Sequence, residues 1–99
     1  MSSKNQCSIS GNILKIEPMR FTPIGIPIIN FEMIHQSRQI ENGVMRDVEV
    51  NIPVIALGDL VKPLIDKTTQ RLVQVTGFLC NKSKKSTKVV LHANNIVFI

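Results

Sequence analysis

The 99-residue sequence predicts an all-β domain, a small barrel of five strands. Apolar, β-branched runs alternate with polar positions, and glycine, proline and asparagine separate the runs, as in strands joined by turns. Only one stretch has helical spacing, and a proline limits it to a turn or two. The length suits a single domain over residues 1–99, with 43% hydrophobic residues to fill one core.

The first strand is predicted over Cys7–Ile16. Its apolar positions change phase after Gly11, between Ile13 and Leu14. A phase change beside a glycine indicates a bulge or a sharp bend, and such a bend lets one strand serve two parts of a barrel. We therefore expect this strand to turn a corner of the barrel.

The connector Glu17–Pro27 contains three prolines, which exclude a helix and favour an extended or turning loop. Arg20 and Phe21 are neighbours within it. A cation beside an aromatic ring is able to contact nucleic acid, which is one interpretation of this pair. The other, which we favour, is that Phe21 caps the core.

The second strand is predicted over Ile28–Gln36, where one face is apolar and the other is mixed. His35 ends the apolar face and has no partner in sequence, so we expect a hydrogen-bonded edge residue rather than a general base. The polar segment Ser37–Val44 is predicted to be a loop, with Asn42-Gly43 as a hairpin turn.

The third strand is predicted from Met45 to about Leu57, and Pro53 within it indicates an edge or a break. Asp47 and Glu49 share its polar face. We expect a solvated outer face there. The alternative is a magnesium pair, which would need further ligands.

The stretch Gly58–Thr69 is the candidate helix, and Pro63 shortens it. The fourth strand is predicted over Leu72–Cys80 and the fifth over Lys88–Ile99. Together these elements predict an OB-fold, a five-stranded Greek-key barrel with a short helical turn between strands three and four. Its ligand face would lie on strands two and three. An SH3-like barrel or a half-open sandwich fits the same pattern.

The positive charge gathers at the C-terminal end of the chain. The net charge is +5 with a pI near 9.6, and Asp66 is the last acidic residue. The segment between the last two strands carries Lys82, Lys84, Lys85 and Lys88. Nucleic acid is favoured over a membrane surface as the partner, because no basic amphipathic helix is visible. The alternative is a hairpin tip that only increases solubility.

The chain lacks a phosphate-binding glycine loop, a nucleophile elbow and an HExxH motif, so we expect a binding protein without enzymatic activity, cofactor or small-molecule substrate. Cys7 and Cys80 match no paired metal-ligand spacing, and zinc bound with His35 and His92 is the alternative to two structural cysteines. Neither a membrane-length apolar run nor a secretory signal is visible, which predicts a cytoplasmic protein.

Aromatic side chains that stack on bases are scarce in this sequence. It has no Trp or Tyr, and of its four phenylalanines Phe31 and Phe98 have the phase of core residues. Stacking contributes ~1–3 kcal/mol per base where it occurs. We therefore expect nucleic-acid binding that is mainly electrostatic and sensitive to salt.

Several segments resemble the PriB family, the primosomal replication proteins N, in the order in which that family has them. They are SxSGNILKIEP (Ser8–Pro18), TPIGIPIINFEMIHQS (Thr22–Ser37), NIPVIALG (Asn51–Gly58), VTGFLCNKSKK (Val75–Lys85) and KVVLHANNI (Lys88–Ile96). The resemblance spans nearly the whole chain. Its most specific part is the combination of TP-x-GIP, F-x-x-x-H and the terminal VLHA.

The resemblance implies a homodimeric OB-fold relative of single-stranded DNA-binding protein that acts in replication restart. It further implies binding of single-stranded DNA and docking of the PriA helicase and DnaT. The basic positions that match the family, with one neighbour that adds to them, are Arg20, Arg46, Lys82, Lys84, Lys85 and Lys88.

Three positions depart from the family pattern. Glu49 and Val44 stand where some members carry aromatic residues, and Gln36 stands at a basic position. Glu49 and Asp47 on the sheet face repel phosphate, so the basic loops are expected to supply most of the contacts that bind DNA. Two alternatives stay open: a protein-interaction adaptor with weak or vestigial DNA binding, and an RNA-binding OB module.

Overall fold

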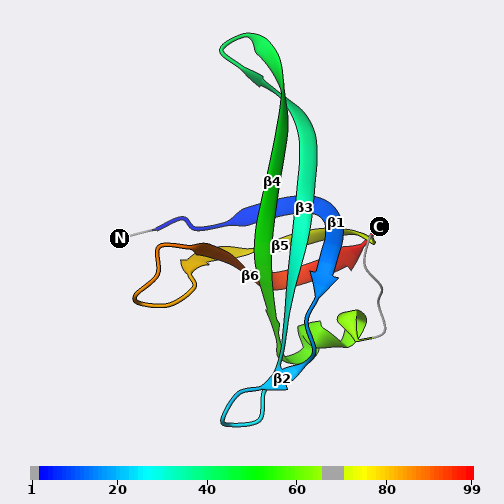
Figure 1. Cartoon of the computed structure of the whole chain (residues 1–99), viewed down its shortest axis with the longest axis vertical. Helices are drawn as coiled ribbons and strands as arrows, with labels where there is room; N and C mark the ends of the chain where they lie inside the picture. The colour runs from blue at the N-terminus through cyan, green and yellow to red at the C-terminus, as the bar shows by residue number, and fades with distance from the viewer. Residues whose placement is uncertain (1–2, 66–70) are drawn as a thin grey trace.

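A computed structural model describes residues 3–65 and 71–99, which form six strands and one short 3-10 helix (Figure 1). In chain order the elements are β1 Cys7–Ile16, β2 Arg20–Phe21, β3 Pro27–Glu41, β4 Val44–Leu57, the 3-10 helix η1 Gly58–Leu64, β5 Leu72–Asn81 and β6 Val89–Phe98. The predicted first strand is confirmed with the same bounds. The predicted last two strands are confirmed to within one residue at their ends.

Five of the strands close into a barrel in the order β1-β5-β6-β4-β3, and β3 pairs again with β1. The pairings are antiparallel except that of β4 with β6, which is parallel at Val54–Leu91 and Ile55–His92. This order, with a short helical connector between β4 and β5, is the OB-fold that the sequence predicts. The SH3-like and sandwich alternatives do not have this closure.

Strand β1 turns a corner of the barrel, as expected. It pairs with β5 through residues 7–12 and with β3 through residues 12–16, and its register shifts between Ile13 and Lys15. Gly11 lies at a close approach of β1 to β3, because a Cβ there would overlap the carbonyl oxygen of Ile34 and lie 2.9 Å from its carbonyl carbon. The glycine therefore permits the close approach that the bend requires.

Strands β3 and β4 continue far beyond the barrel as a two-stranded arm, defined here as residues 37–48 (Figure 1). The predicted loop over residues 37–44 is wrong, because pairing continues to Glu41 and Val44 and only Asn42 and Gly43 form the turn. Both have positive φ, 51° and 77°, as the predicted hairpin turn requires. A ribbon with both faces in water needs no apolar alternation, so its polar sequence resembles that of a loop.

The barrel interior holds the core, and η1 closes one end of it. The buried apolar residues that pack together there are Ile13, Ile29, Phe31, Met33, Val54, Ala56, Val61, Leu64, Val73, Val75, Leu91 and Ile96. Pro53 precedes the two residues of β4 that pair with β6. Within the described ranges, the preceding part of β4 pairs with β3 alone, so the predicted edge position of Pro53 is confirmed.

The connector between β1 and β3 differs from its prediction. It contains β2, whose Arg20 and Phe21 pair with Ile28 and Pro27 to make a small hairpin at the end of the barrel opposite the arm (Figure 1). Phe21 is 61% exposed, so the expectation that it caps the core is wrong. A two-residue strand set outside the barrel wall does not carry its side chain into the interior.

The predicted helix is present as η1 over Gly58–Leu64, with Pro63 in its last turn. Residues 66–69 of the predicted stretch lie outside the described residues. Within the ranges that the structure describes, no helix has the length and apolar character to cross a membrane.

Candidate nucleic-acid interface

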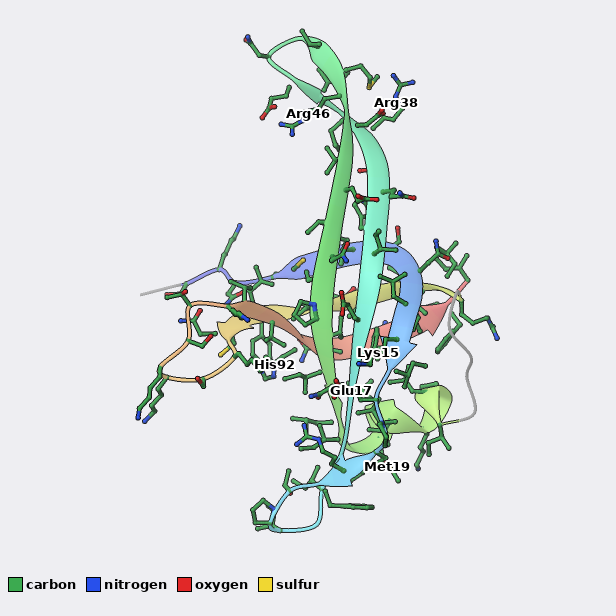
Figure 2. All side chains as sticks on the ribbon, in the orientation of Figure 1. Lys15, Glu17, Met19, Arg38, Arg46 and His92 are labelled. Atoms are coloured by element: carbon green, nitrogen blue, oxygen red, sulfur yellow. The ribbon has the colours of Figure 1, made fainter. Side chains whose placement is uncertain are left out.

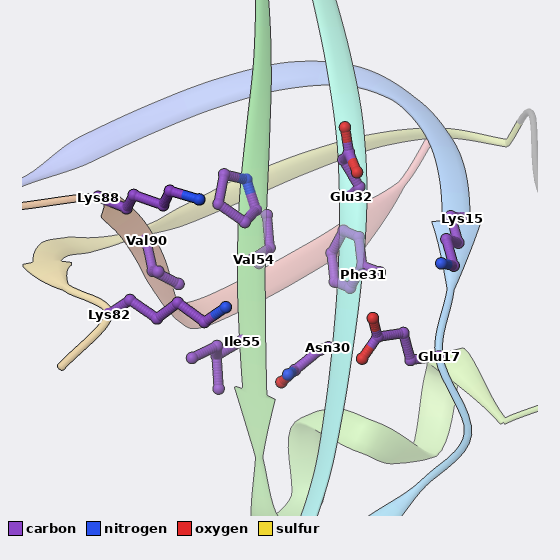
Figure 3. A pocket seen from close by; sticks show the side chains of 11 residues that line it. Lys15, Glu17, Asn30, Phe31, Glu32, Val54, Ile55, Lys82, Lys88 and Val90 are labelled. Atoms are coloured by element: carbon purple, nitrogen blue, oxygen red, sulfur yellow. The ribbon is translucent and has the colours of Figure 1, made fainter. Parts of the chain in front are cut away.

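An open cleft of about 220 Å³ lies between the end of β1, the outer face of β3 and β4, and the loop that joins β5 to β6 (Figure 3). Its lining residues are Lys15, Glu17, Asn30, Phe31, Glu32, Pro53, Val54, Ile55, Lys82, Lys88 and Val90. This is the location that the OB-fold prediction assigns to the ligand face. Apolar groups from β4 and β6 form its middle, and charged groups form its two sides.

The lysine-rich loop, residues 82–88, supplies one side of the cleft. It is closed at its base by a hydrogen bond of 2.8 Å from the Lys82 backbone N–H to the Lys88 carbonyl. The Ser86 N–H also donates to the Ser83 carbonyl at 3.1 Å. This closure brings Lys82 and Lys88 together although six positions separate them, and both side chains reach toward β4 (Figure 3).

The other side of the cleft carries two cross-strand pairs. Lys15 lies opposite Glu32 in the β1–β3 ladder. One step further, the Glu17 N–H donates to the Asn30 carbonyl at 2.9 Å, so Glu17 lies opposite Asn30. Directly opposed residues have Cβ atoms about 4.5–5.5 Å apart, and residues two apart on a strand share a face. The four side chains therefore lie on one polar side of the cleft, spread along β1 and β3 in Figure 3.

The charged groups of the cleft have unused bonding capacity. The ion pairs found within residues 3–65 and 71–99 are Arg38–Asp47, Arg46–Glu41 and Lys62–Asp59, and none of these residues lines the cleft. Glu32 accepts one hydrogen bond, from Asn51 Nδ2 at 3.3 Å. Asn30 Oδ1 is buried without a donor among the described residues. The carboxylates of Glu17 and Glu32 leave acceptor capacity for an occupant that donates hydrogen bonds.

Next to the cleft lies an aromatic pair, which the sequence alone did not predict. Phe78 of β5 stacks on His92 of β6, with ring centroids 5.1 Å apart and an interplanar angle of 5°. His92 lies two residues after Val90, so both face the same side of β6, and its backbone pairs with that of Ile55. Phe78 is 39% exposed, which leaves ring surface available for stacking. The pairing of Phe78 with His92 becomes visible only when the hairpin register is known.

The structure does not gather all the predicted basic residues at the cleft. Lys82 and Lys88 line it, whereas Lys84 and Lys85 are exposed and lie outside the lining set. Arg46 is on the arm, where its Nη1 donates to Glu41 Oε1 at 2.6 Å (Figure 2). Arg20 is exposed on β2 and also lies outside the lining set. Their roles in binding stay predictions.

Asp47 and Glu49 lie on the outer face of β4, as expected. Asp47 Oδ1 pairs with Arg38 Nε at 3.2 Å, and Glu49 Oε1 accepts a hydrogen bond from Gln36 at 2.8 Å. No cluster of three or more His, Cys, Asp or Glu suited to a metal occurs among the described residues, so neither the magnesium nor the zinc alternative gains support. Glu49 shares a face with Pro53, about 14 Å away along β4 at the usual strand rise.

His35 has a structural role. Its Nδ1 donates to the Ser10 carbonyl at 2.7 Å, and its Nε2 lies 2.8 Å from Ser37 Oγ. The first bond connects β3 to β1 at the start of the arm, and the second lies within β3. The expectation of a hydrogen-bonded edge histidine is confirmed.

Comparison with known proteins identifies the family. A family model described as another single-strand binding protein family matches residues 5–95. The replication restart protein PriB of Bordetella pertussis is 40% identical over 88 residues, which are 89% of this chain and 82% of that protein. The chain belongs to the PriB family. This confirms the resemblance found in the sequence, and PriB proteins are DNA-binding proteins rather than enzymes.

Solved structures agree with the fold. The PriB protein of Ralstonia solanacearum has a TM-score of 0.86 at 24% identity, over 98% of this chain and 100% of that chain. A Plasmodium falciparum SSB, solved in complex with ssDNA, has a TM-score of 0.76 at 14% identity, over 100% of this chain and 97% of that one. At these identities the likeness shows the OB-fold alone.

Proposed function

We propose that this PriB-family protein binds single-stranded DNA during replication restart and that the cleft beside the lysine-rich loop is its main contact. The observation that supports this most directly is the position of Lys82 and Lys88. Both reach over the outer face of β4 (Figure 3). The stacked rings of Phe78 and His92 lie on β5 and β6, the two strands that this loop joins. Proteins that hold single strands combine a basic groove for phosphates with aromatic surfaces for bases.

The proposed path of the strand follows from the charge distribution. Lys82 and Lys88 would hold phosphates at the cleft, and Lys84 and Lys85 would extend the positive potential outside it. Glu49 makes the outer face of β4 between the cleft and the arm unfavourable for phosphate, and Asp47 on the arm is paired with Arg38. Arg20 is proposed to meet the strand only where it continues beyond the cleft, and Arg46 only after releasing Glu41.

We also propose that the protein forms a homodimer and docks the PriA helicase and DnaT in the cytoplasm. Large apolar side chains outside the cleft support protein contacts. Ile40 near the arm turn is 71% exposed, and Ile24 in the β2 hairpin is 84% exposed. Isolated two-stranded ribbons are only marginally stable in water, so a partner that covers the arm would stabilise it.

Titration of a labelled single-stranded oligonucleotide, followed by fluorescence anisotropy over a range of salt concentrations, tests the proposal. We expect tighter binding to single strands than to duplex, with affinity that falls as salt rises. Matched DNA and RNA strands separate this function from that of an RNA-binding module. Equal affinity for single strand and duplex, or binding confined to RNA, would contradict the proposal.

A second candidate function is a protein-interaction adaptor with vestigial DNA binding. The acidic outer face favours it, because Asp47 and Glu49 lie on the same side of β4 as the cleft. Recovery of the helicase by the immobilised protein without DNA, together with negligible oligonucleotide binding, would select the adaptor. Both measurements are made on the same preparation, so the two functions are distinguished directly.

Replacing Phe78 with alanine is expected to weaken single-strand binding about tenfold, because base stacking contributes ~1–3 kcal/mol per base. Leu79→Ala is the matched control. Leu79 is the next residue on β5, has a similar exposure of 38% and points to the opposite face. Anisotropy at one salt concentration measures both variants. Wild-type affinity in a folded Phe78→Ala protein would remove the stacked pair from the interface.

A further inference from the structure

The cleft has positive groups on one side and negative groups on the other, an arrangement that phosphate binding alone does not require. Lysines 82 and 88 face it from the β5–β6 loop, whereas the polar group on β1 and β3 presents two carboxylates (Figure 3). A site that served only as a basic groove would gain nothing from acidic residues on its far side. The arrangement fits an occupant that is anionic at one end and rich in hydrogen-bond donors at the other.

One nucleotide of a DNA strand has this character. Its phosphate would lie at Lys82 and Lys88, and its base would extend over Ile55 toward β3. The cleft volume of about 220 Å³ is smaller than the ~300 Å³ at which pockets for drug-sized ligands begin, so it suits a single base. The edge of that base would then meet Glu17, Glu32 and Lys15.

The four bases differ in the hydrogen-bond donors and acceptors on the edge that would face these three side chains. Guanine has two adjacent donors, N1–H and N2–H₂, beside the O6 acceptor. Cytosine and adenine each have one amino donor beside a ring-nitrogen acceptor, and thymine has one donor between two carbonyls. An ionised carboxylate only accepts hydrogen bonds and an ammonium only donates them. The set of two carboxylates and one ammonium therefore matches guanine and is least suited to thymine.

We propose that the cleft prefers guanine over the other bases. The N1–H and N2–H₂ groups of guanine donate hydrogen bonds to the carboxylates of Glu17 and Glu32, and the ammonium group of Lys15 donates to O6. This inference rests on the proposed function, since it names the base that the same site selects. The cross-strand register places Lys15 beside Glu32 and Glu17 beside Asn30 without requiring any movement of the backbone.

Fluorescence anisotropy with short oligo-dT, with and without one central dG, tests the preference. We expect the dG strand to bind on the order of tenfold more tightly, the scale of one good bidentate base contact. Inosine lacks the N2 amino group and should lose most of the gain, whereas 7-deazaguanine keeps the donor edge and should retain it. A gain that inosine keeps in full, or that 7-deazaguanine loses, would overturn the assignment of this edge.

The double variant Glu17→Gln, Glu32→Gln completes the test, because glutamine adds an NH₂ donor where the carboxylate only accepts. The ratio of dG to dT affinity should fall to about one, although both strands bind more tightly once two negative charges are gone. Glu49→Gln removes a charge from the same face outside the cleft and should leave the ratio unchanged. Equal affinity of the wild type for both strands overturns the guanine inference alone, whereas absence of single-strand binding overturns the proposed function with it.

Discussion

Replacing Lys82 and Lys88 together with alanine is expected to weaken single-strand binding on the order of tenfold at about 0.2 M salt, and more at lower salt. Both side chains line the cleft, and neither takes part in an ion pair in the described part of the chain. Their charges are therefore free to neutralise phosphate. Each phosphate contact on a single strand contributes about 0.7 to the slope of log K against log salt, so the slope should fall by about 1.4.

The double variant Lys84→Ala, Lys85→Ala is the matched control, since it removes the same charge from the same loop outside the cleft lining. It should lower the affinity less and change the salt slope by less than the cleft pair. If the two double variants lose equal affinity, the loop acts as a diffuse positive charge and the cleft has no special role. If neither loses affinity, the lysine-rich loop is not the DNA contact.

Replacing Gly77 with alanine is expected to lower the free energy of unfolding by about 3 kcal/mol or more, because the overlap is with backbone rather than with a flexible side chain. A Cβ at this position would overlap the carbonyl oxygen of His92 and lie 2.8 Å from its carbonyl carbon. Gly77 sits at the register shift between β5 and β6. Thermal unfolding followed by circular dichroism should show a midpoint about 12 °C lower or more.

Gly43→Ala provides the contrast for this prediction. Gly43 has a φ of 77°, and a Cβ added to it would have no other atom within 4 Å, so the substitution adds backbone strain without overlap. That strain costs about 1 kcal/mol. A Gly77→Ala protein no less stable than Gly43→Ala would mean that β6 moves away from β5 at little cost, contrary to the packing of this hairpin.

Local patterns are sufficient to predict most of the barrel. The alternation in Cys7–Ile16 and its phase change at Gly11 predict both the strand and its bend, because side chains on a half-buried strand must alternate. Polar segments are harder to interpret. The sequence predicts a loop at Ser37–Val44 and a core position at Phe21, and both predictions are wrong, since a solvated ribbon and an external hairpin put no constraint on which positions are apolar.

The candidate site likewise has one part that the sequence predicts and another that depends on the tertiary structure. The density of lysine between β5 and β6 is a property of composition, and it is enough to predict a basic loop at the edge of an OB-fold. Composition does not say which lysines converge, and the backbone bond between Lys82 and Lys88 decides that. The stacking of Phe78 on His92 likewise depends on a register that contains a bulge.

The chain therefore encodes its strands, its turns and its charge locally, through periodicity and residue type that act over a few positions. The pairing of β1 with β3 is different, because it joins Lys15 and Glu17 to Asn30 and Glu32 across a bent strand and a long connector. Which side chains meet there depends on the closure of the barrel, where one shift in register would turn each of them to the other face. The cleft and its divided charge exist only in the closed barrel.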